Sequence, residues 1–470
     1  MPVQPSRWSF ALVRPILLNK LGGLGTRNKP LKRTAWLDGL RGFAAFLVYW
    51  HHHQLWAHYP TGETVIFENA FGYDNKYYFV ALPVVRIFFS GGHYAVTVFF
   101  VISGYVLSTK PLSLIQAGEL AKAGDSIGSA LFRRWLRLYI PVIGTTFLYM
   151  SCWHWFGIWT AAGEMKENWW AELWSWYAEF KNYSFVFRTG DDSSFPYLYN
   201  FHVWSIPVEF KGSIIVYTAL FAFSRCARNP RIWCELSLIF YFLYVADGWY
   251  GAMFMAGMLL CEIDLLAIAN ELPRFFSYFE SFKELLFLNL FIASLYLGGV
   301  PSSDWDIQVL EKSPGWAYLS YLKPQAVFDF KWFYLFWAAL FLVASVPRLP
   351  WLKHFFEGRF CQYLGRISFA LYLVHGPILW VLGDRLYTAT GFTRDSHKER
   401  LPKWIDAFPI SKAGPLGLEP SFLVPHVILL PVTLWLAEIV TKLFDEPSVK
   451  IASWLYNKSL APRSTPNLNP

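Results

Sequence analysis

Charged side chains are scarce in this chain of 470 residues. Asp, Glu, Lys and Arg make up 16% of it, whereas soluble proteins average about a quarter. Hydrophobic residues reach 55%, and the mean hydropathy is +0.30. This composition excludes a mainly water-soluble protein and leaves no stretch that resembles a large soluble domain. It predicts an all-α bundle of membrane-spanning helices.

Cysteine is also rare, and its five residues show neither metal-ligand spacing nor a disulfide framework. We interpret them as small apolar side chains in or beside hydrophobic segments. No two histidines stand four residues apart, so the helical zinc-binding spacing is missing and no metal is predicted. The formal net charge of +8 is interpreted as basic cytosolic loops and not as a nucleic-acid-binding surface.

Long hydrophobic stretches are what the sequence has in abundance. A helix that spans a bilayer needs about 17–25 residues, and about ten windows are candidates for such helices. With the N-terminus inside, the loops richest in Lys and Arg fall on the cytosolic side. We therefore predict about ten spans with both termini cytosolic. The windows lie at 38–58, 92–109, 138–158, 204–223, 232–247, 249–268, 284–300, 331–347, 367–386 and 422–443.

The segments outside these windows give a simple domain plan. Residues 1–33 form a basic cytosolic tail with no acidic residue, residues 34–450 a single transmembrane domain, and residues 451–470 a polar C-terminal tail. Three outer loops are long for structureless connections, so we expect them either to be functional, covering or shaping an acceptor site, or to contain short helices of their own. These loops are 160–203, 300–330 and 386–421.

A cation and three consecutive imidazoles interrupt the first hydrophobic window. A central arginine in a membrane helix costs about 2.5–3.5 kcal/mol on the insertion scale. Arg41 and His52 are eleven residues apart, which places them within roughly 20° on one helix face and about 16 Å apart along it. We predict that His52 is a general base and Arg41 an anion contact; the alternative is that both make structural hydrogen bonds between helices. His51 and His53 point roughly 100° away on either side and are expected to be structural.

Small and basic residues mark the next two windows. Ser103 and Gly104 can let two helix backbones approach closely, and that structural role is the expected one for Ser103. Arg133, Arg134 and Arg137 gather at the cytosolic membrane boundary. They are either a positive-inside signal or a clamp for phosphates, which arginine binds bidentately.

Two buried polar side chains stand in later windows. Glu209 lies one or two turns inside the membrane and must be paired or neutral there. It could orient His52, bind an acceptor hydroxyl, or form a structural contact, for example with Lys211. His375 follows Tyr372 in mid-helix just before a proline kink, and this second imidazole has either a direct or a structural role.

Six short motifs occur in an order that resembles the acyltransferase-3 family of integral membrane acyltransferases, most closely its fungal-type members. They span roughly residues 34–450. We interpret the last motif as the end of the final helix. The motifs are Leu-Asp-Gly-Leu-Arg-Gly at 37–42, Phe-Phe-Val-Ile-Ser-Gly-Tyr at 99–105, Arg-Arg-x-x-Arg-Leu at 133–138, His-x-Trp-Ser-x-x-x-Glu at 202–209, Ser-x-x-Leu-Tyr-Leu-x-His at 368–375 and Asp-Glu-Pro at 445–447.

The resemblance implies transfer of an acyl group, usually acetyl, from acyl-CoA to a hydroxyl, with acyl-CoA as co-substrate and no bound cofactor. The family's Arg-x10-His pattern falls on Arg41 and His52, and its acid falls on Glu209. The sequence after that acid departs from the usual Gln-Phe-Tyr-like continuation, so the resemblance supports a role for Glu209 less strongly than it does for Arg41 and His52. The family's loop arginines, Arg134 and Arg137 with Arg133 beside them, would face CoA.

Two other functions are compatible with buried charges in a membrane: a transporter whose charges line a path, and a non-catalytic scaffold. A transporter predicts internal repeats, which are not detectable, and a scaffold leaves the Arg41–His52 face unexplained. The acceptor is either a hydrophobic metabolite or a glycan. The expected location is a secretory-pathway membrane, first of all the endoplasmic reticulum, with membrane lipid as a partner.

Overall fold

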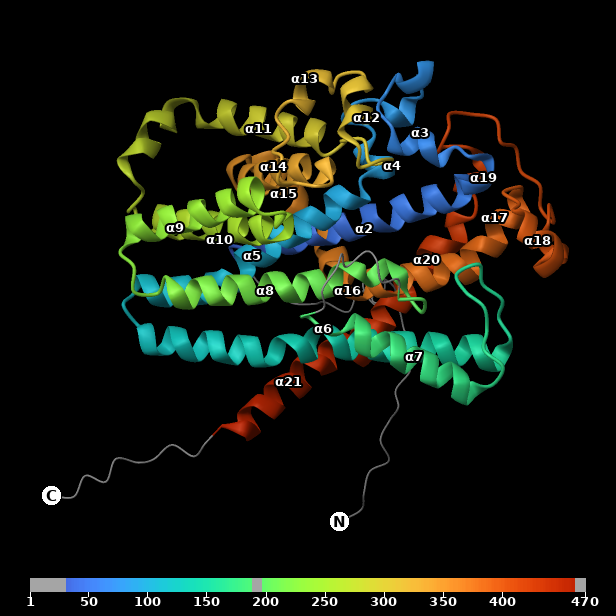
Figure 1. Ribbon diagram of the computed structural model, residues 1–470, viewed down its shortest axis with the longest axis horizontal. Coiled ribbons are helices and arrows are strands. Elements are labelled where there is room, and N and C mark those ends of the chain that lie inside the picture. The colour runs from blue at the N-terminus through green and yellow to red at the C-terminus, as the bar shows by residue number, and fades with distance from the viewer. Residues whose placement is uncertain (1–30, 188–196, 461–470) are drawn as a thin grey trace, which may run out of the picture.

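The computed structural model describes residues 31–187 and 197–460, and its regular structure in these ranges is helical (Figure 1). No β-strand occurs among them, and Thr160 and Gly163 form an isolated bridge. The predicted all-α class is confirmed. The tail to residue 30 and the last ten residues lie outside the described ranges. The α-helices are α2 (Ala35–His58), α3 (Thr64–Glu68), α4 (Ile87–Ser90), α5 (Gly92–Gln116), α6 (Leu120–Phe156), α7 (Trp169–Tyr183), α8 (Ser205–Ala222), α9 (Arg228–Phe240), α10 (Trp249–Ile268), α11 (Lys283–Leu297), α12 (Ile307–Lys312), α13 (Ala317–Ser320), α14 (Phe330–Ser345), α15 (Pro350–Glu357), α16 (Arg359–Ile378), α17 (Asp384–Thr390), α18 (Asp395–Arg400), α19 (Pro420–Leu423), α20 (His426–Val440) and α21 (Glu446–Ser459).

Six helical segments of the described chain are long and apolar enough to cross a membrane, fewer than the ten windows. Of the other four windows, the first forms α2, whose arginine and histidines make it less apolar, and 138–158 falls in α6, whose first half is charged. The windows at 232–247 and 284–300 form α9 and α11, of 13 and 15 residues. The six segments are Gly92–Gln116, Phe201–Ala222, Trp249–Ile268, Phe330–Arg348, Arg359–Thr390 and Pro420–Ser459.

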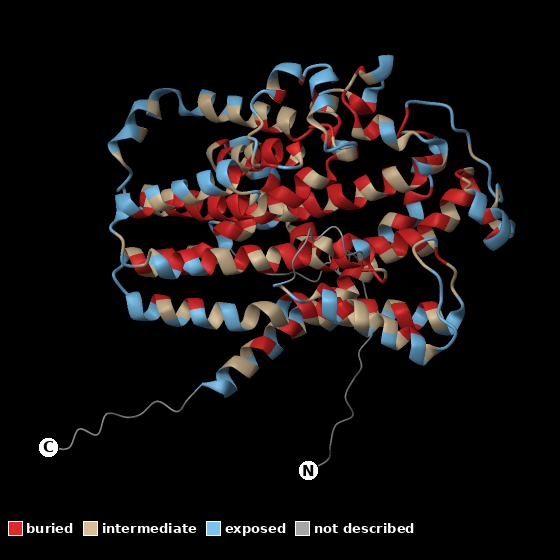
Figure 2. Ribbon diagram, viewed as in Figure 1, coloured by how far each residue is buried: buried red, intermediate tan, exposed pale blue. Residues whose placement is uncertain are grey.

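Helix α2 lies at the centre of the bundle, packed against α5 and α16 (Figure 1). Burial is greatest on these central helices and decreases toward the peripheral ones (Figure 2). Two glycines allow the closest approach of α2 to α16: a Cβ on Gly42 would lie 2.7 Å from the Cα of Gly365. Gly104 of α5 is equally close to α10, where a Cβ would lie 2.8 Å from the carbonyl carbon of Phe254. The predicted close approach at the Ser103–Gly104 pair is therefore confirmed at Gly104.

We expect Gly42→Ala to destabilise the protein, because the added methyl meets backbone of α16, which cannot move aside. Overpacking of this kind costs about 1–3 kcal/mol. Gly124→Ala on α6 is the matched control, since nothing lies within 4 Å of a Cβ there. Thermal unfolding of the detergent-solubilised proteins measures both. Equal melting temperatures for the two variants would contradict the close packing of α2 on α16.

The long outer loops contain short helices, which was one of the two possibilities expected for them. α7 lies within 160–203, α12 and α13 lie within 300–330, and α18 lies within 386–421. The C-terminal prediction was wrong in one respect, because the Asp-Glu-Pro motif does not end the helix. The chain passes through a short π-helix, Thr441–Asp445, directly into α21. Pro447 lies in the first turn of α21, where its missing N–H is tolerated. Part of the predicted polar tail, through Ser459, is thus a helix that packs on α6.

Candidate active site

Three imidazoles from three separate elements meet beside α2. His52 comes from α2, His375 from α16, and His202 from a 3-10 turn, Phe201–Trp204, that precedes α8. The Nε2 atom of His375 lies 3.0 Å from Nδ1 of His52. The ring centroid of His202 lies 4.1 Å from that of His52 and 5.0 Å from that of His375. His202 and His375 are buried, whereas His52 is half-buried, so the group is reachable through His52.

A proline in α16 helps to hold the turn that presents His202. Pro377 has no N–H, so it cannot form the usual helical bond to the carbonyl of Leu373. The Asn200 side chain fills this position by donating from Nδ2 to Leu373 O at 2.9 Å. The carbonyl that Pro377 leaves free in α16 is therefore bonded by Asn200, which stands at the start of the turn that contains His202.

Tyr372 makes a second connection between the same two elements. Its hydroxyl donates to the backbone carbonyl of His202 and accepts from Ser205 Oγ at 2.7 Å. Gly376, one turn further along α16, leaves no room for a Cβ because His202 Nδ1 occupies that space. Tyr372 is thus placed behind the histidine group, where it fixes the backbone of His202.

Arg41 and His52 both contact α16, and Arg41 lies nearer the start of α2. Its Nε donates to Ser368 Oγ at 3.1 Å, and its Nη2 donates to the Gly365 carbonyl at 3.2 Å and to Asp38 at 3.0 Å. The Arg41 side chain is 40% exposed, so part of the guanidinium remains available to a ligand. Arg41 and His52 lie on the face of α2 that packs on α16.

Glu209 forms an ion pair with Arg134, and the pair is nearly buried, with 14% and 13% of the two side chains exposed. Arg134 also donates from Nε to Ser213 Oγ at 2.8 Å, and Ser103 hydrogen-bonds to Glu209. The carboxylate therefore has its partners in the arginine cluster. Its closest connections are to a phosphate-binding candidate and not to the histidine group.

The other two loop arginines lie beside this pair. Arg133 donates to the Ser129 carbonyl at 3.0 Å and to Ser453 Oγ of α21 at 3.4 Å. Arg137 and Arg41 both interact electrostatically with Asp445, which the sequence predicts only as part of a helix end. Four arginines from α2 and α6 thus share one end of the bundle with three carboxylates, those of Asp38, Glu209 and Asp445.

The two neighbouring histidines also make contacts outside the group of His52, His202 and His375. His53 Nδ1 lies 2.7 Å from the hydroxyl of Tyr387, which in turn lies 3.1 Å from His426 Nε2. His51 packs near His93, with ring centroids 5.9 Å apart. His53 is therefore hydrogen-bonded outside the His52 group, whereas the ring of His51 also contacts that of His52, with centroids 5.2 Å apart.

The three ring nitrogens of His52, His202 and His375 that face one another lie within 4.8 Å, close enough for three ligands of one metal ion. Catalytic zinc has three protein ligands and an open position, so the donor set fits such an ion. The four-residue histidine spacing of helical zinc sites marks only ligands on one helix, so residues 150 or more positions apart give no such signal. The same geometry is also that of a hydrogen-bonded imidazole pair, whose consequences are developed below.

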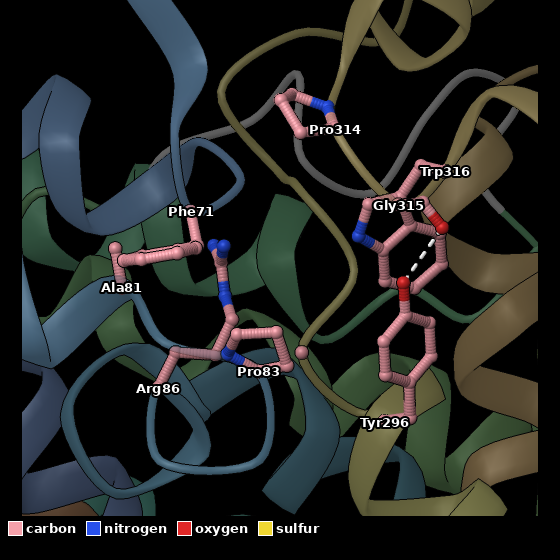
Figure 3. Close-up of a pocket in the computed structure, with 9 residues that line it drawn as sticks. Phe71, Ala81, Pro83, Arg86, Tyr296, Pro314, Gly315 and Trp316 are labelled. Atoms are coloured by element: carbon pink, nitrogen blue, oxygen red, sulfur yellow. Dashed lines mark hydrogen bonds between the residues drawn. The ribbon is translucent and has the colours of Figure 1, made fainter. Parts of the chain in front are cut away.

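Two cavities lie elsewhere in the described part of the chain. One, of about 190 Å³, is lined by Arg86, Tyr296 and Trp316 (Figure 3). Arg86 is buried there and donates to the backbone carbonyls of Asn69 and Phe67, so its charge serves to hold a loop. The other, of about 230 Å³, is lined by hydrophobic residues of α2 and of five further helices, α4, α5, α11, α14 and α15. Neither contains a residue predicted for the site.

The sequence does not predict the direct part that His202 takes in the histidine group. In its motif, His-x-Trp-Ser-x-x-x-Glu, only the glutamate is predicted to belong to the site. Nothing in a single sequence says that residues 52, 202 and 375 share one level of the bundle. The repeated occurrence of a lone histidine in an apolar window was the one signal that could have grouped them.

A helical bundle with six candidate membrane spans, a buried imidazole group and an arginine cluster suits a membrane-integral enzyme. The chain belongs to the acyltransferase family described as "Acyltransferase domain", whose model matches residues 34–435. It is 30% identical to the O-acetyltransferase PaAT-1 of Phomopsis amygdali, over 93% of this chain and 88% of that protein. It is 23% identical to acyltransferase clz18 of Cochliobolus lunatus, over 92% and 97%. No solved structure matches the chain. The protein is an acyltransferase, and the transporter and scaffold alternatives are set aside.

Proposed function

We propose that the protein transfers an acetyl group from acetyl-CoA to a hydroxyl of a hydrophobic small molecule, with His52 as general base. The observation that carries this proposal is the half-buried imidazole of His52, hydrogen-bonded on one ring nitrogen to His375. A histidine held in this way can take a proton through its other nitrogen. The relative from Phomopsis amygdali, named an O-acetyltransferase, supports acetyl as the group that is moved.

The reaction is a direct acyl transfer. His52 removes the proton of the acceptor hydroxyl as the oxygen attacks the thioester carbon, the carbon–sulfur bond breaks, and the protonated imidazole returns its proton to the CoA sulfur. An acetyl-histidine intermediate is the competing route. Direct transfer predicts no labelled protein when the enzyme is mixed with radiolabelled acetyl-CoA in the absence of acceptor.

CoA is a polyanion, and the arginine cluster is the part of the site suited to it. Arg133, Arg134, Arg137 and Arg41 would bind its phosphates, since guanidinium groups form paired hydrogen bonds to phosphate oxygens. This end lies about three helical turns from His52 along α2. The extended pantetheine arm would carry the thioester across that distance.

Glu209, Ser103 and Tyr372 are assigned supporting parts. Glu209 would keep the Arg134 guanidinium oriented, with Ser103 donating to the same carboxylate. Tyr372 would hold the His202 turn in place. A hydrophobic acceptor is favoured over a glycan because aromatic rings line this level of the bundle: the ring centroids of Trp380 and His202 are 5.1 Å apart.

The topology that we propose from the loop charges agrees with this function. About ten spans with cytosolic termini would put the arginine cluster on the cytosolic side, where CoA is available. The endoplasmic reticulum membrane is the proposed location, and an acetylation step in secondary metabolism is the proposed context. Tagging either terminus and testing its protease accessibility in sealed microsomes checks the orientation.

The experiment that tests the activity measures free CoA released from acetyl-CoA by the purified protein in lipid nanodiscs. We expect release to rise when farnesol is added and to remain at background with chitotriose, which represents a glycan acceptor. Mass spectrometry would show the acetyl ester of the alcohol. Stimulation by chitotriose alone would contradict the hydrophobic acceptor, and release without any acetylated product would contradict acyl transfer.

A further inference from the structure

The hydrogen bonds around His375 determine where its proton is. Its Nδ1 atom lies 3.3 Å from the backbone carbonyl of Leu371, and a carbonyl oxygen can only accept. The hydrogen of His375 is therefore on Nδ1. A neutral imidazole carries one N–H, so Nε2 of His375 holds a lone pair. Burial favours the neutral ring, because moving a charge out of water costs free energy.

This lone pair in turn determines the tautomer of His52. Nδ1 of His52 lies 3.0 Å from Nε2 of His375 and must be the donor in that bond. The hydrogen of neutral His52 is then on Nδ1, and its Nε2 holds the lone pair. We propose that His375 is a positioning residue that selects this tautomer and leaves Nε2 of His52 as the basic nitrogen. The proposal rests on the function proposed above.

The surroundings of α16 explain why His375 can hold this position. Its Nδ1 is bonded to the helix in which it resides, one turn back, so the ring has little freedom to rotate. Pro377 follows two residues later, and the Leu373 carbonyl that it leaves free is bonded by Asn200. The turn that carries His375 is thus attached to the neighbouring element by a buried hydrogen bond.

His375 accepts the same hydrogen bond from His52 before and after the proton is transferred. When Nε2 of His52 takes the hydroxyl proton, His52 becomes an imidazolium whose Nδ1–H still points at the His375 lone pair. That bond becomes charge-assisted and therefore stronger. When the CoA sulfur leaves, it takes the proton from Nε2 of His52. His375 keeps the same protonation state throughout and supports the charge that forms on its partner.

Two variants of His375 separate this role from simple packing. His375→Leu removes the acceptor, so both ring tautomers of His52 become available and the forming imidazolium loses its partner. We expect its kcat for CoA release with farnesol to fall about 10²-fold, with the KM for acetyl-CoA changed less than about twofold. His375→Gln supplies a side-chain carbonyl as acceptor and should recover most of that loss. Equal defects in the two variants, or a loss confined to KM, would overturn the proposal.

A double variant makes the dependence on His52 explicit. If His375 acts through His52, His375→Leu should not reduce further the residual activity of His52→Ala. A further fall of the same size would show an independent role and overturn the proposal. His52→Ala with full activity would instead refute the general base itself. Melting temperatures identify any variant that is misfolded, and His53→Gln is the matched buried control. If His375→Leu is misfolded, the activity of His375→Gln decides whether the proposal holds.

Metal analysis of the purified wild-type protein completes the test. A tightly bound ion at one per chain that disappears in His52→Ala, His202→Ala and His375→Leu would occupy the nitrogens used by the proposed bond, and would overturn it. A metal content near zero with full activity, unchanged by chelator, supports the imidazole pair.

Discussion

Replacing His52 with alanine will reduce turnover of acetyl-CoA by about 10²–10⁴-fold, which is the usual contribution of a positioned general base. The KM for acetyl-CoA should change little, because the proposed CoA site, the arginine cluster, lies about three turns away. His52→Gln keeps the approximate shape and polarity of the side chain but cannot accept the proton, so it should be as inactive as the alanine variant. Steady-state release of CoA in nanodiscs, with farnesol as acceptor, measures both variants.

The control for this experiment lies one residue further along the same helix. His53 is fully buried and bonded to Tyr387, in surroundings distinct from the His52 group. His53→Gln should therefore keep turnover within a few-fold of wild type. If His52→Gln retained activity while folding normally, the general-base role would be wrong; if His53→Gln lost activity as severely as His52→Ala, the choice of histidine would be wrong.

Removing Arg134 is expected to have the largest effect on stability. Arg134→Ala leaves the Glu209 carboxylate nearly buried without its cation, and breaking a buried pair in this way costs about 3–5 kcal/mol. The slight exposure of the pair favours the lower end of that range. The variant should also bind acetyl-CoA more weakly if Arg134 contacts phosphate. Thermal unfolding and the KM for acetyl-CoA give the two effects separately.

Two comparisons show whether the loss comes from the unpaired carboxylate. Adding Glu209→Gln to Arg134→Ala should restore much of the lost stability, since a neutral amide is less costly to bury than a charge. It should not restore acetyl-CoA binding. The control is Arg366→Ala, which breaks an ion pair whose side chains are 49% and 47% exposed and which should cost less than about 1 kcal/mol. Full recovery of KM in the double variant would argue against phosphate contact by Arg134.

Hydrophobic windows predict membrane helices well, but the more polar windows do so less clearly than the most apolar ones. The most apolar windows became the six candidate spans, because twenty apolar residues are hard to place anywhere but in a membrane or a large core. The first window gave α2, which has the expected length but carries the polar residues of the site. The Asp445–Pro447 motif was misread because proline is accepted in the first turn of a helix as readily as after its end.

The sequence by itself determined the class of the fold and the shared face of Arg41 and His52, because helical periodicity is a local property of the chain. It also set His52 apart from His51 and His53 by angle alone. Only the tertiary structure decided that His202 and His375 join His52, that Glu209 pairs with Arg134, and that Asp445 lies near the arginines. Those contacts join residues 75 to more than 300 positions apart, and their geometry depends on how glycines such as Gly42 and Gly365 let the helices approach.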